Sequence, residues 1–177
     1  MRSRREIGRT NQAVGSNFEI WIEGQHQKAL YLGILAHVAH NQPSTKMIGG
    51  RLIYTEAGVA DYTGVLDRSG KTLAVEAKST GDDKLYRTVI SPTQIKHLDA
   101  VAKAGGLALL LVEFRTDRKR FAIPWLEVPW TILRSSQSVT ADTLSKWFID
   151  PNPESCYLSM FYSPGPPTSK PRVFPRE

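Results

Sequence analysis

The sequence predicts a mixed α/β fold (α+β) in which a small mixed β-sheet is flanked by helices. Amphipathic segments long enough for helices alternate with short apolar segments, in the order helix, strand, hairpin, helix, strand. A continuous apolar run from Leu107 to Phe114 has the length and character of a buried central strand. Together these observations favour one sheet with helices packed against it.

The chain of 177 residues is long enough for one domain with its own hydrophobic core, which we place at residues 13–150. Residues 1–12 are basic and poor in apolar residues, so we expect a flexible arm there. Its arginines are Arg2, Arg4, Arg5 and Arg9. These arginines could bind DNA phosphates, or they could simply be solvated side chains of a flexible tail. Residues 151–177 are expected to form a Pro-rich tail, of which 157–162 could dock on the domain.

The formal net charge of +6 favours a polyanionic partner, with nucleic acid ahead of an acidic membrane. The single Cys156 cannot form an internal disulfide, which fits a reducing compartment. No stretch has the pattern of a secretory signal or approaches the ~20 apolar residues that span a bilayer. We therefore expect a cytoplasmic protein with no membrane partner.

The first helix is expected to begin after Asn17, which can act as its N-cap, and to end near Gly33. Glu19 falls in its first turn, where the helix dipole alone favours an acidic residue. His26 is expected to face solvent. A strand follows from about Ile34, and the histidines on it lie on opposite faces, so we assign no catalytic role to any of the three.

Residues 43–58 form a candidate protruding segment between the first two strands. Lys46 and Arg51 lie in it. The alternative is an ordinary hairpin loop in which both cations are solvated.

The stretch from Asp61 to Lys78 predicts two strands joined by the turn Asp67-Arg68-Ser69-Gly70. Glu76 and Lys78 are two residues apart, so on a strand they share a face. Hairpin pairing would bring Asp61 close to Glu76. Two carboxylates and an amine would then converge on one edge of the sheet.

Paired carboxylates suit Mg²⁺ or Mn²⁺, and such an ion can activate water and neutralise charge on a phosphate. The alternative is a surface hairpin with solvated charges. Glu76 and Lys78 alternate with apolar Val75 and Ala77 in a strand otherwise poor in charge, which favours a site.

A second helix begins at Ser91-Pro92-Thr93-Gln94, which combines an N-cap serine, proline at the first position and a capping-box glutamine. Gly105-Gly106 ends it. As a capping-box residue, Gln94 needs no other role. Lys84 and Arg87, in the polar stretch before the helix, are candidate DNA contacts, and Lys96 and His97 are expected to face solvent or phosphate. Thr140 is expected to cap a last short helix.

Four motifs in register resemble those of the RecU-type Holliday junction resolvases, within the PD-(D/E)XK nuclease superfamily. They are Gly15-Ser16-Asn17-Phe18-Glu19, Asp61-Tyr62-Thr63-Gly64, Glu76-Ala77-Lys78-Ser79-Thr80 and Gln94-Ile95-Lys96-His97-Leu98. The resemblance covers about Gly15 to Leu133. It departs where Val59-Ala60 precedes the aspartate and where the segment between the first two strands is short.

The resemblance implies a restriction-endonuclease-like nuclease core and a homodimer that binds four-way junction DNA. It implies a metal-dependent, structure-selective endodeoxyribonuclease that resolves Holliday junctions in recombination and repair, with Mg²⁺ as cofactor and Mn²⁺ able to substitute. The catalytic residues would be Lys78, Glu76, Asp61 and Gln94, and the metal ligands Asp61, Glu76, the carbonyl of Ala77, and Glu19. The protruding segment would enter the centre of the junction, where Lys46 and Arg51 would contact phosphates.

Two alternatives remain open from the residues. One is a different nuclease of the same superfamily, of the restriction or repair type, which would cut linear duplex as readily as junctions. The other is a non-catalytic DNA-binding module on a nuclease fold, against which the intact Asp61, Glu76 and Lys78 argue.

Overall fold

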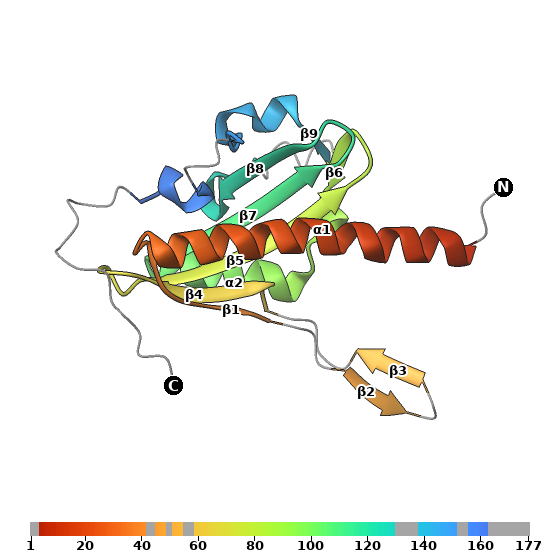
Figure 1. Ribbon diagram of the computed structural model, residues 1–177, viewed down its shortest axis with the longest axis horizontal. Coiled ribbons are helices and arrows are strands. Elements are labelled where there is room, and N and C mark those ends of the chain that lie inside the picture. Colours follow the sequence, from red (N-terminus) through yellow and green to blue (C-terminus); the bar gives the residue numbers. More distant parts are fainter. Residues whose placement is uncertain are drawn as a thin grey trace.

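A computed structural model describes residues 4–41, 45–48, 51–54, 59–129, 138–151 and 156–162. Side chains are described for 17–41, 59–129, 138–151 and 156–162. Figure 1 shows a twisted central sheet with the long first helix lying across it. In the described part of the chain, no helix is long and apolar enough to cross a membrane.

The central sheet has five strands in the order β1-β4-β5-β7-β8. Only β5 and β7 pair in parallel, and every other neighbouring pair in this sheet is antiparallel. The predicted mixed sheet is therefore confirmed, with the apolar run from Leu107 to Phe114 as its fourth strand in order. The strands are β1 (Leu35–His40), β4 (Tyr62–Leu66), β5 (Thr72–Thr80), β7 (Leu107–Phe114) and β8 (Lys119–Pro124).

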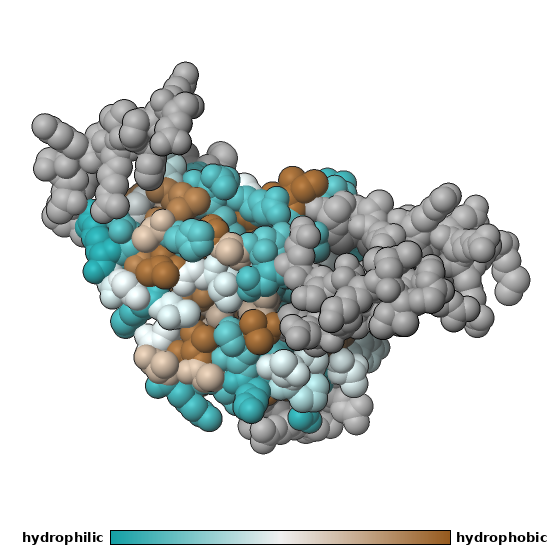
Figure 2. Space-filling model, turned by 90° about the horizontal axis from the view of Figure 1, so that it is seen from below, coloured by the Kyte–Doolittle hydropathy of each residue, from teal (hydrophilic) through white to brown (hydrophobic). Residues whose placement is uncertain are grey.

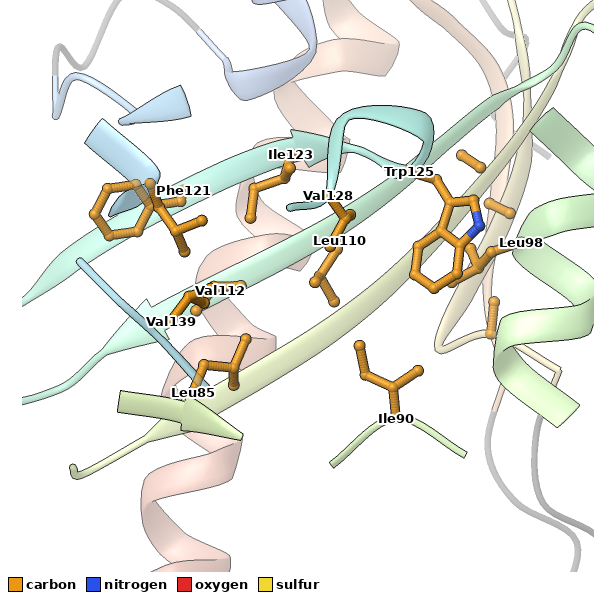
Figure 3. Packing of buried hydrophobic residues seen from close by; sticks show 14 of the residues in the cluster. Leu85, Ile90, Leu98, Leu110, Val112, Phe121, Ile123, Trp125, Val128 and Val139 are labelled. Carbon is orange, nitrogen blue, oxygen red and sulfur yellow. The ribbon is translucent and has the colours of Figure 1, made fainter. Parts of the chain in front are cut away.

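The sheet is covered on both faces, which explains the continuous apolar character of β7. Leu109 and Leu111 face the helix α1 (Arg4–Tyr31), in a buried cluster that includes Ile22. Leu110 faces the other side, in a cluster with Leu98 of the helix α2 (Pro92–Lys103). Figure 3 shows this second cluster, in which Leu98, Trp125, Leu110 and Ile123 are labelled. Alternate residues of one strand thus serve two layers of the core.

Helix α1 begins well before the predicted N-cap. It runs from Arg4 to Tyr31, so Asn17 lies inside it and residues 4–12, expected to form a flexible arm, are helical. The physical reason is visible in the sequence: residues 4–16 contain no proline and several good helix formers. A local capping signal at Asn17 competes with continued helix propagation, and propagation prevails.

The β4–β5 hairpin forms as predicted, with Tyr62 opposite Val75 and Gly64 opposite Leu73. Its turn contains two residues with positive φ, Arg68 at 57° and Gly70 at 63°. Gly64 is required where β4 meets β1, because a Cβ there would lie 2.4 Å from the carbonyl oxygen of His37. The antiparallel pairing of β4 with β1 therefore depends on a glycine in the middle of the strand.

Helix α2 also begins as predicted. The Ser91 side chain accepts a hydrogen bond from the backbone N–H of Gln94, and the Gln94 side chain accepts one from the backbone N–H of Ser91. Gly105 follows the helix with φ of 79°, a conformation that glycine adopts without strain.

The candidate protruding segment contains a separate hairpin of two antiparallel strands, β2 (Thr45–Ile48) and β3 (Arg51–Tyr54). Figure 1 shows it away from the five-stranded sheet. Residues 42–44, 49–50 and 55–58 lie outside the described residues, as do the side chains of Lys46 and Arg51.

The remaining elements pack on both sides of the sheet. Strand β6 (Lys84–Tyr86) pairs with β9 (Ser138–Thr140). Short 3₁₀ turns are η1 (Arg87–Val89), η2 (Trp125–Glu127), η3 (Asp142–Trp147) and η4 (Tyr157–Met160). Of these elements, β6, β9, η2 and η3 contribute to the α2 side of the core, and η4 contributes to the α1 side. The prediction that Thr140 caps the last helix is wrong, because Thr140 ends β9 and η3 follows Ala141 without a side-chain cap. The expected docking of 157–162 is confirmed, since Tyr157 and Leu158 are buried.

Exposed apolar side chains are scattered over the described elements, among them Tyr31, Val65 and Leu126. The face drawn in Figure 2 likewise mixes hydrophilic and hydrophobic residues. Single exposed apolar residues are normal for a folded protein and call for no functional explanation.

Candidate active site

The hairpin brings Asp61 against the strand that carries Glu76 and Lys78. Asp61 immediately precedes β4, and its Oδ2 accepts a hydrogen bond of 2.8 Å from the backbone N–H of Ala77 in β5. The predicted convergence of two carboxylates and an amine on one edge of the sheet is therefore what the backbone pairing produces.

Glu76 is fully buried, and its two oxygens have different surroundings. Its Oε1 forms an ion pair with Lys78 Nζ and accepts a 2.6 Å hydrogen bond from Gln94 Nε2. Its Oε2 is buried without a hydrogen-bond partner. Burial and the neighbouring Asp61 carboxylate raise the pKa of Glu76 to about 7, against the opposing effect of Lys78.

Gln94 combines the predicted helix cap with a hydrogen bond to Glu76. Its amide oxygen accepts from the backbone N–H of Ser91 at 2.9 Å, and its amide nitrogen donates to Glu76. Because an amide side chain both accepts and donates, the capping box and the contact with Glu76 do not compete. The start of α2 thereby fixes the orientation of the buried carboxylate.

An open cleft of about 650 Å³ lies beside these residues. Glu19 of α1, Asp61, the backbone region of Ala77, and Lys78 line it, whereas Glu76 and Gln94 are not among the lining residues. The cleft is also lined by Phe18, His40, Tyr62, Ser79, Thr80, Gly81, Asp82 and Arg115. Of the predicted site residues with described side chains, the structure thus brings four into the cleft lining. Glu76 contacts both Lys78 and Gln94 through polar groups.

The residues present fit a hard divalent cation. An unpartnered buried oxygen on Glu76, close to the Asp61 carboxylate, is an arrangement that a cation would relieve. In the described part of the chain, no three side chains of His, Cys, Asp or Glu are grouped as a metal site. Mg²⁺ commonly uses only one or two carboxylates with water, so Asp61, Glu76 and the Ala77 carbonyl could suffice. Glu19 lines the same cleft without completing such a group.

The predicted DNA contacts with described side chains, Lys84 and Arg87, lie outside the cleft lining. Lys84 in β6 and Arg87 in η1 are exposed and are not among the residues that line the cleft. Arg4, Arg5 and Arg9 lie in α1 and Lys46 and Arg51 in β2 and β3, where only the backbone is described. Arg2 lies outside the described residues.

The prediction that His26 faces solvent is wrong. His26 is only 2% exposed, and its Nε2 lies 2.6 Å from Tyr157 Oη, because the C-terminal segment covers this face of α1. Burial, assisted by His40, lowers the pKa of His26 to about 4. His97, expected to face solvent or phosphate, is half-buried and lines an open pocket beside the turn at Gly70, where its Nε2 is buried without a partner among the described residues.

Arg115 lines the cleft but was not among the predicted site residues. It follows β7 directly, and β7 runs parallel to β5, with Ser79 opposite Glu113. Parallel strands end at the same edge of a sheet, so a residue that follows β7 lies close to the end of β5. That pairing is the signal that could have identified it.

The chain was compared with known proteins in three ways. The model of the family described as Recombination protein U matches residues 35–158, well over half of the chain. No curated protein matches. Among solved structures, a Holliday junction resolvase, Hjc, from the archaeal hyperthermophile Archaeoglobus fulgidus is similar with a TM-score of 0.44. It is 15% identical, over 71% of this chain and 90% of that chain.

Proposed function

The chain belongs to the Recombination protein U family, the RecU-type Holliday junction resolvases, and from that premise we propose a metal-dependent, structure-selective endodeoxyribonuclease that acts in recombination and repair. The observation that supports the proposal most is the arrangement around Glu76. A fully buried carboxylate is contacted by an ammonium and an amide and lies beside a second carboxylate at the rim of an open cleft. Burying a carboxylate beside a second one costs stability, and such arrangements are typical of functional sites.

Asp61, Glu76 and the carbonyl of Ala77 would hold Mg²⁺ or Mn²⁺, with Glu19 as a further ligand, directly or through water. When bound, the ion would lower the pKa of a water molecule and offset negative charge on the phosphate. The hydrogen bond from Ala77 N–H to Asp61 Oδ2 holds that carboxylate in place, and Gln94 holds Glu76. The protein therefore supplies a rigid pair of carboxylates rather than two mobile side chains.

Lys78 has a separate role in the proposal. Its Nζ is paired with Glu76, and its side chain lines the cleft. An ammonium in that place can orient the attacking water and stabilise charge that develops on the phosphate in the transition state. Direct hydrolysis by water needs no protein nucleophile.

The proposal includes a homodimer. Cutting a four-way junction symmetrically requires two strand cleavages, and two-fold symmetry supplies two identical sites. The β2–β3 hairpin would enter the open centre of the junction. The arginines near the N-terminus, with Lys84 and Arg87, would contact the DNA backbone outside the cleft.

One assay tests the proposed function. A four-way junction, a linear duplex of the same sequence and a single strand are each incubated with the protein in Mg²⁺ or in EDTA. We expect paired cuts in the junction, in Mg²⁺ only. Equal cutting of the duplex would point instead to a restriction-type or repair-type nuclease, and binding without any cutting would point to a DNA-binding module.

A further inference from the structure

Arg115 combines a position in the cleft with a guanidinium that has no acidic partner among the described residues. It lines the cleft together with Lys78, and these two supply the Lys and Arg side chains of the described lining. Lys78 is ion-paired with Glu76, whereas Arg115 makes no ion pair with any carboxylate in the described part of the chain. The guanidinium therefore retains most of its hydrogen-bonding capacity for a ligand.

Hydrogen bonds between the residues that end β5 and those that follow β7 hold Arg115 in place. Its backbone N–H donates to the carbonyl of Thr80 at 2.9 Å, and its Nη1 donates to Ser79 Oγ at 3.3 Å. The next residue, Thr116, donates from Oγ1 to the carbonyl of Gly81 at 3.0 Å. Bonds to backbone and side chain together hold the arginine over the loop that follows β5.

Ser79 is itself held by a residue of the neighbouring strand β7. Its Oγ donates to Glu113 Oε2 at 2.9 Å, and Glu113 Oε1 accepts from Arg120 Nε at 3.0 Å. Arg120 in turn lies over the ring of Trp21, at 4.3 Å from its centroid. Glu113 thus neutralises Arg120 rather than Arg115, and Ser79 is a positioning residue for the cleft arginine.

Gly81 leaves the space that the Arg115 guanidinium occupies. A Cβ on residue 81 would lie 2.7 Å from Arg115 Nη2, closer than real contacts allow. The backbone of Gly81 does not have the positive φ that excludes other residues. Its lack of a side chain therefore matters for the arginine rather than for the chain conformation.

The charged residues of the described cleft lining include three acidic side chains, and of its two cations Lys78 is already paired with Glu76. Glu19, Asp61 and Asp82 all line the cleft, and each repels the phosphates of an entering DNA strand. Arginine offers several donors in a planar fork that matches the oxygens of a phosphate.

We propose that Arg115 binds one backbone phosphate of the strand that enters the cleft, next to the phosphate that is cut. The inference rests on the proposed function, because it takes the cleft as the place where the strand is cleaved. Arg115 would act as a binding and positioning group, with Ser79 and Gly81 setting where its guanidinium lies.

The test measures junction binding without cleavage, in EDTA, over a series of salt concentrations. Arg115→Ala should weaken binding roughly tenfold at moderate salt and make the slope of log affinity against log salt shallower by about one unit. Lys119→Ala is the matched control. Lys119 carries the same charge in the same basic region, but it is not among the cleft residues and is paired with Asp117 at 3.6 Å. We expect it to leave the slope unchanged.

Junctions that carry a single uncharged methylphosphonate at each phosphate around the cut site then locate the contact. For one position of the methylphosphonate, wild-type protein and the Lys119 variant should bind the modified junction more weakly than the unmodified one. Arg115→Ala should bind the two junctions equally well. Gly81→Ala keeps every charge but displaces the Arg115 guanidinium. It should therefore also reduce the loss of affinity that the methylphosphonate causes at that position. Thermal unfolding of each variant checks that the fold is intact.

The outcomes separate this inference from the proposed function. Wild-type protein that cuts junctions in Mg²⁺, with an Arg115→Ala variant that keeps the wild-type salt slope and methylphosphonate profile, overturns only the inference. Wild-type protein that neither binds nor cuts junctions overturns both.

Discussion

Gln94 Nε2 donates a 2.6 Å hydrogen bond to Glu76 Oε1, while Gln94 Oε1 accepts from the N-cap of its own helix. A single side chain thus couples the start of α2 to the buried carboxylate of the candidate active site. The N-terminus of α2, rather than a loop, therefore determines where the Glu76 carboxylate points.

Gln94→Met should remove both bonds while keeping a similar volume, and Ser91→Ala should remove only the serine half of the cap. Each should lower the free energy of unfolding by about 1 kcal/mol, the usual cost of a lost cap. Only the Gln94 variant should also raise the Mg²⁺ concentration needed for cleavage, because only this change removes the hydrogen bond that orients the Glu76 carboxylate. Denaturant unfolding and metal-dependent cleavage rates check this. A Ser91 variant with the same metal defect would mean that helix stability alone is responsible.

Lys78→Ala should slow the chemical step by roughly 10²–10³, the usual effect of losing one transition-state stabiliser. Junction affinity should change little. Single-turnover kinetics at saturating protein separate the two effects, with the exposed Lys71→Ala as control. A variant that only binds DNA more weakly would reduce Lys78 to a phosphate contact.

His26 and Glu76 should give opposite pH dependences of stability. The pKa of His26 is lowered to about 4 in the folded state, so the unfolded chain binds more protons and stability falls as pH drops from 6.5 towards 4. The pKa of Glu76 is raised to about 7, so the folded state binds more protons and stability falls as pH rises from 4.5 towards 7. Each effect is roughly 3 kcal/mol at full extent, so the two offset each other in the wild type.

Two variants separate these contributions when denaturant unfolding is measured in EDTA. Glu76→Gln should lose stability between pH 7 and pH 4.5, because only the His26 effect remains. His26→Gln should gain stability over the same interval. If both variants followed the wild-type pH profile, neither group would have the folded-state pKa that its burial implies.

Much of the site could be predicted because its signals are local. The shared face of Glu76 and Lys78 follows from strand periodicity, and the position of Gln94 follows from a capping box within four residues. The burial of His26 was not predictable in this way, because Tyr157, which covers it, is 131 positions away in the sequence. Arg115 was missed for a similar reason, since its place depends on the parallel pairing of β5 with β7.

The β2–β3 hairpin leads to a prediction about selectivity. Changing both Lys46 and Arg51 to Ala should reduce the ratio of junction affinity to duplex affinity, because a linear duplex has no open centre for the hairpin to enter. Competition binding at fixed salt checks the ratio. Uniformly weaker binding with an unchanged ratio would mean that the hairpin only grips the DNA backbone.

The central claim is that Asp61 and Glu76 jointly hold the metal ion on which cleavage depends. Its most direct test is Mn²⁺ binding to the free protein, followed by electron paramagnetic resonance, for wild type, Asp61→Asn, Glu76→Gln and the control Glu113→Gln. Wild type and the Glu113 variant should bind Mn²⁺ in the same affinity range, and the Asp61 and Glu76 variants should lose that binding along with junction cleavage while still binding junctions. Undiminished Mn²⁺ binding or near wild-type cleavage by either the Asp61 or the Glu76 variant would contradict the claim.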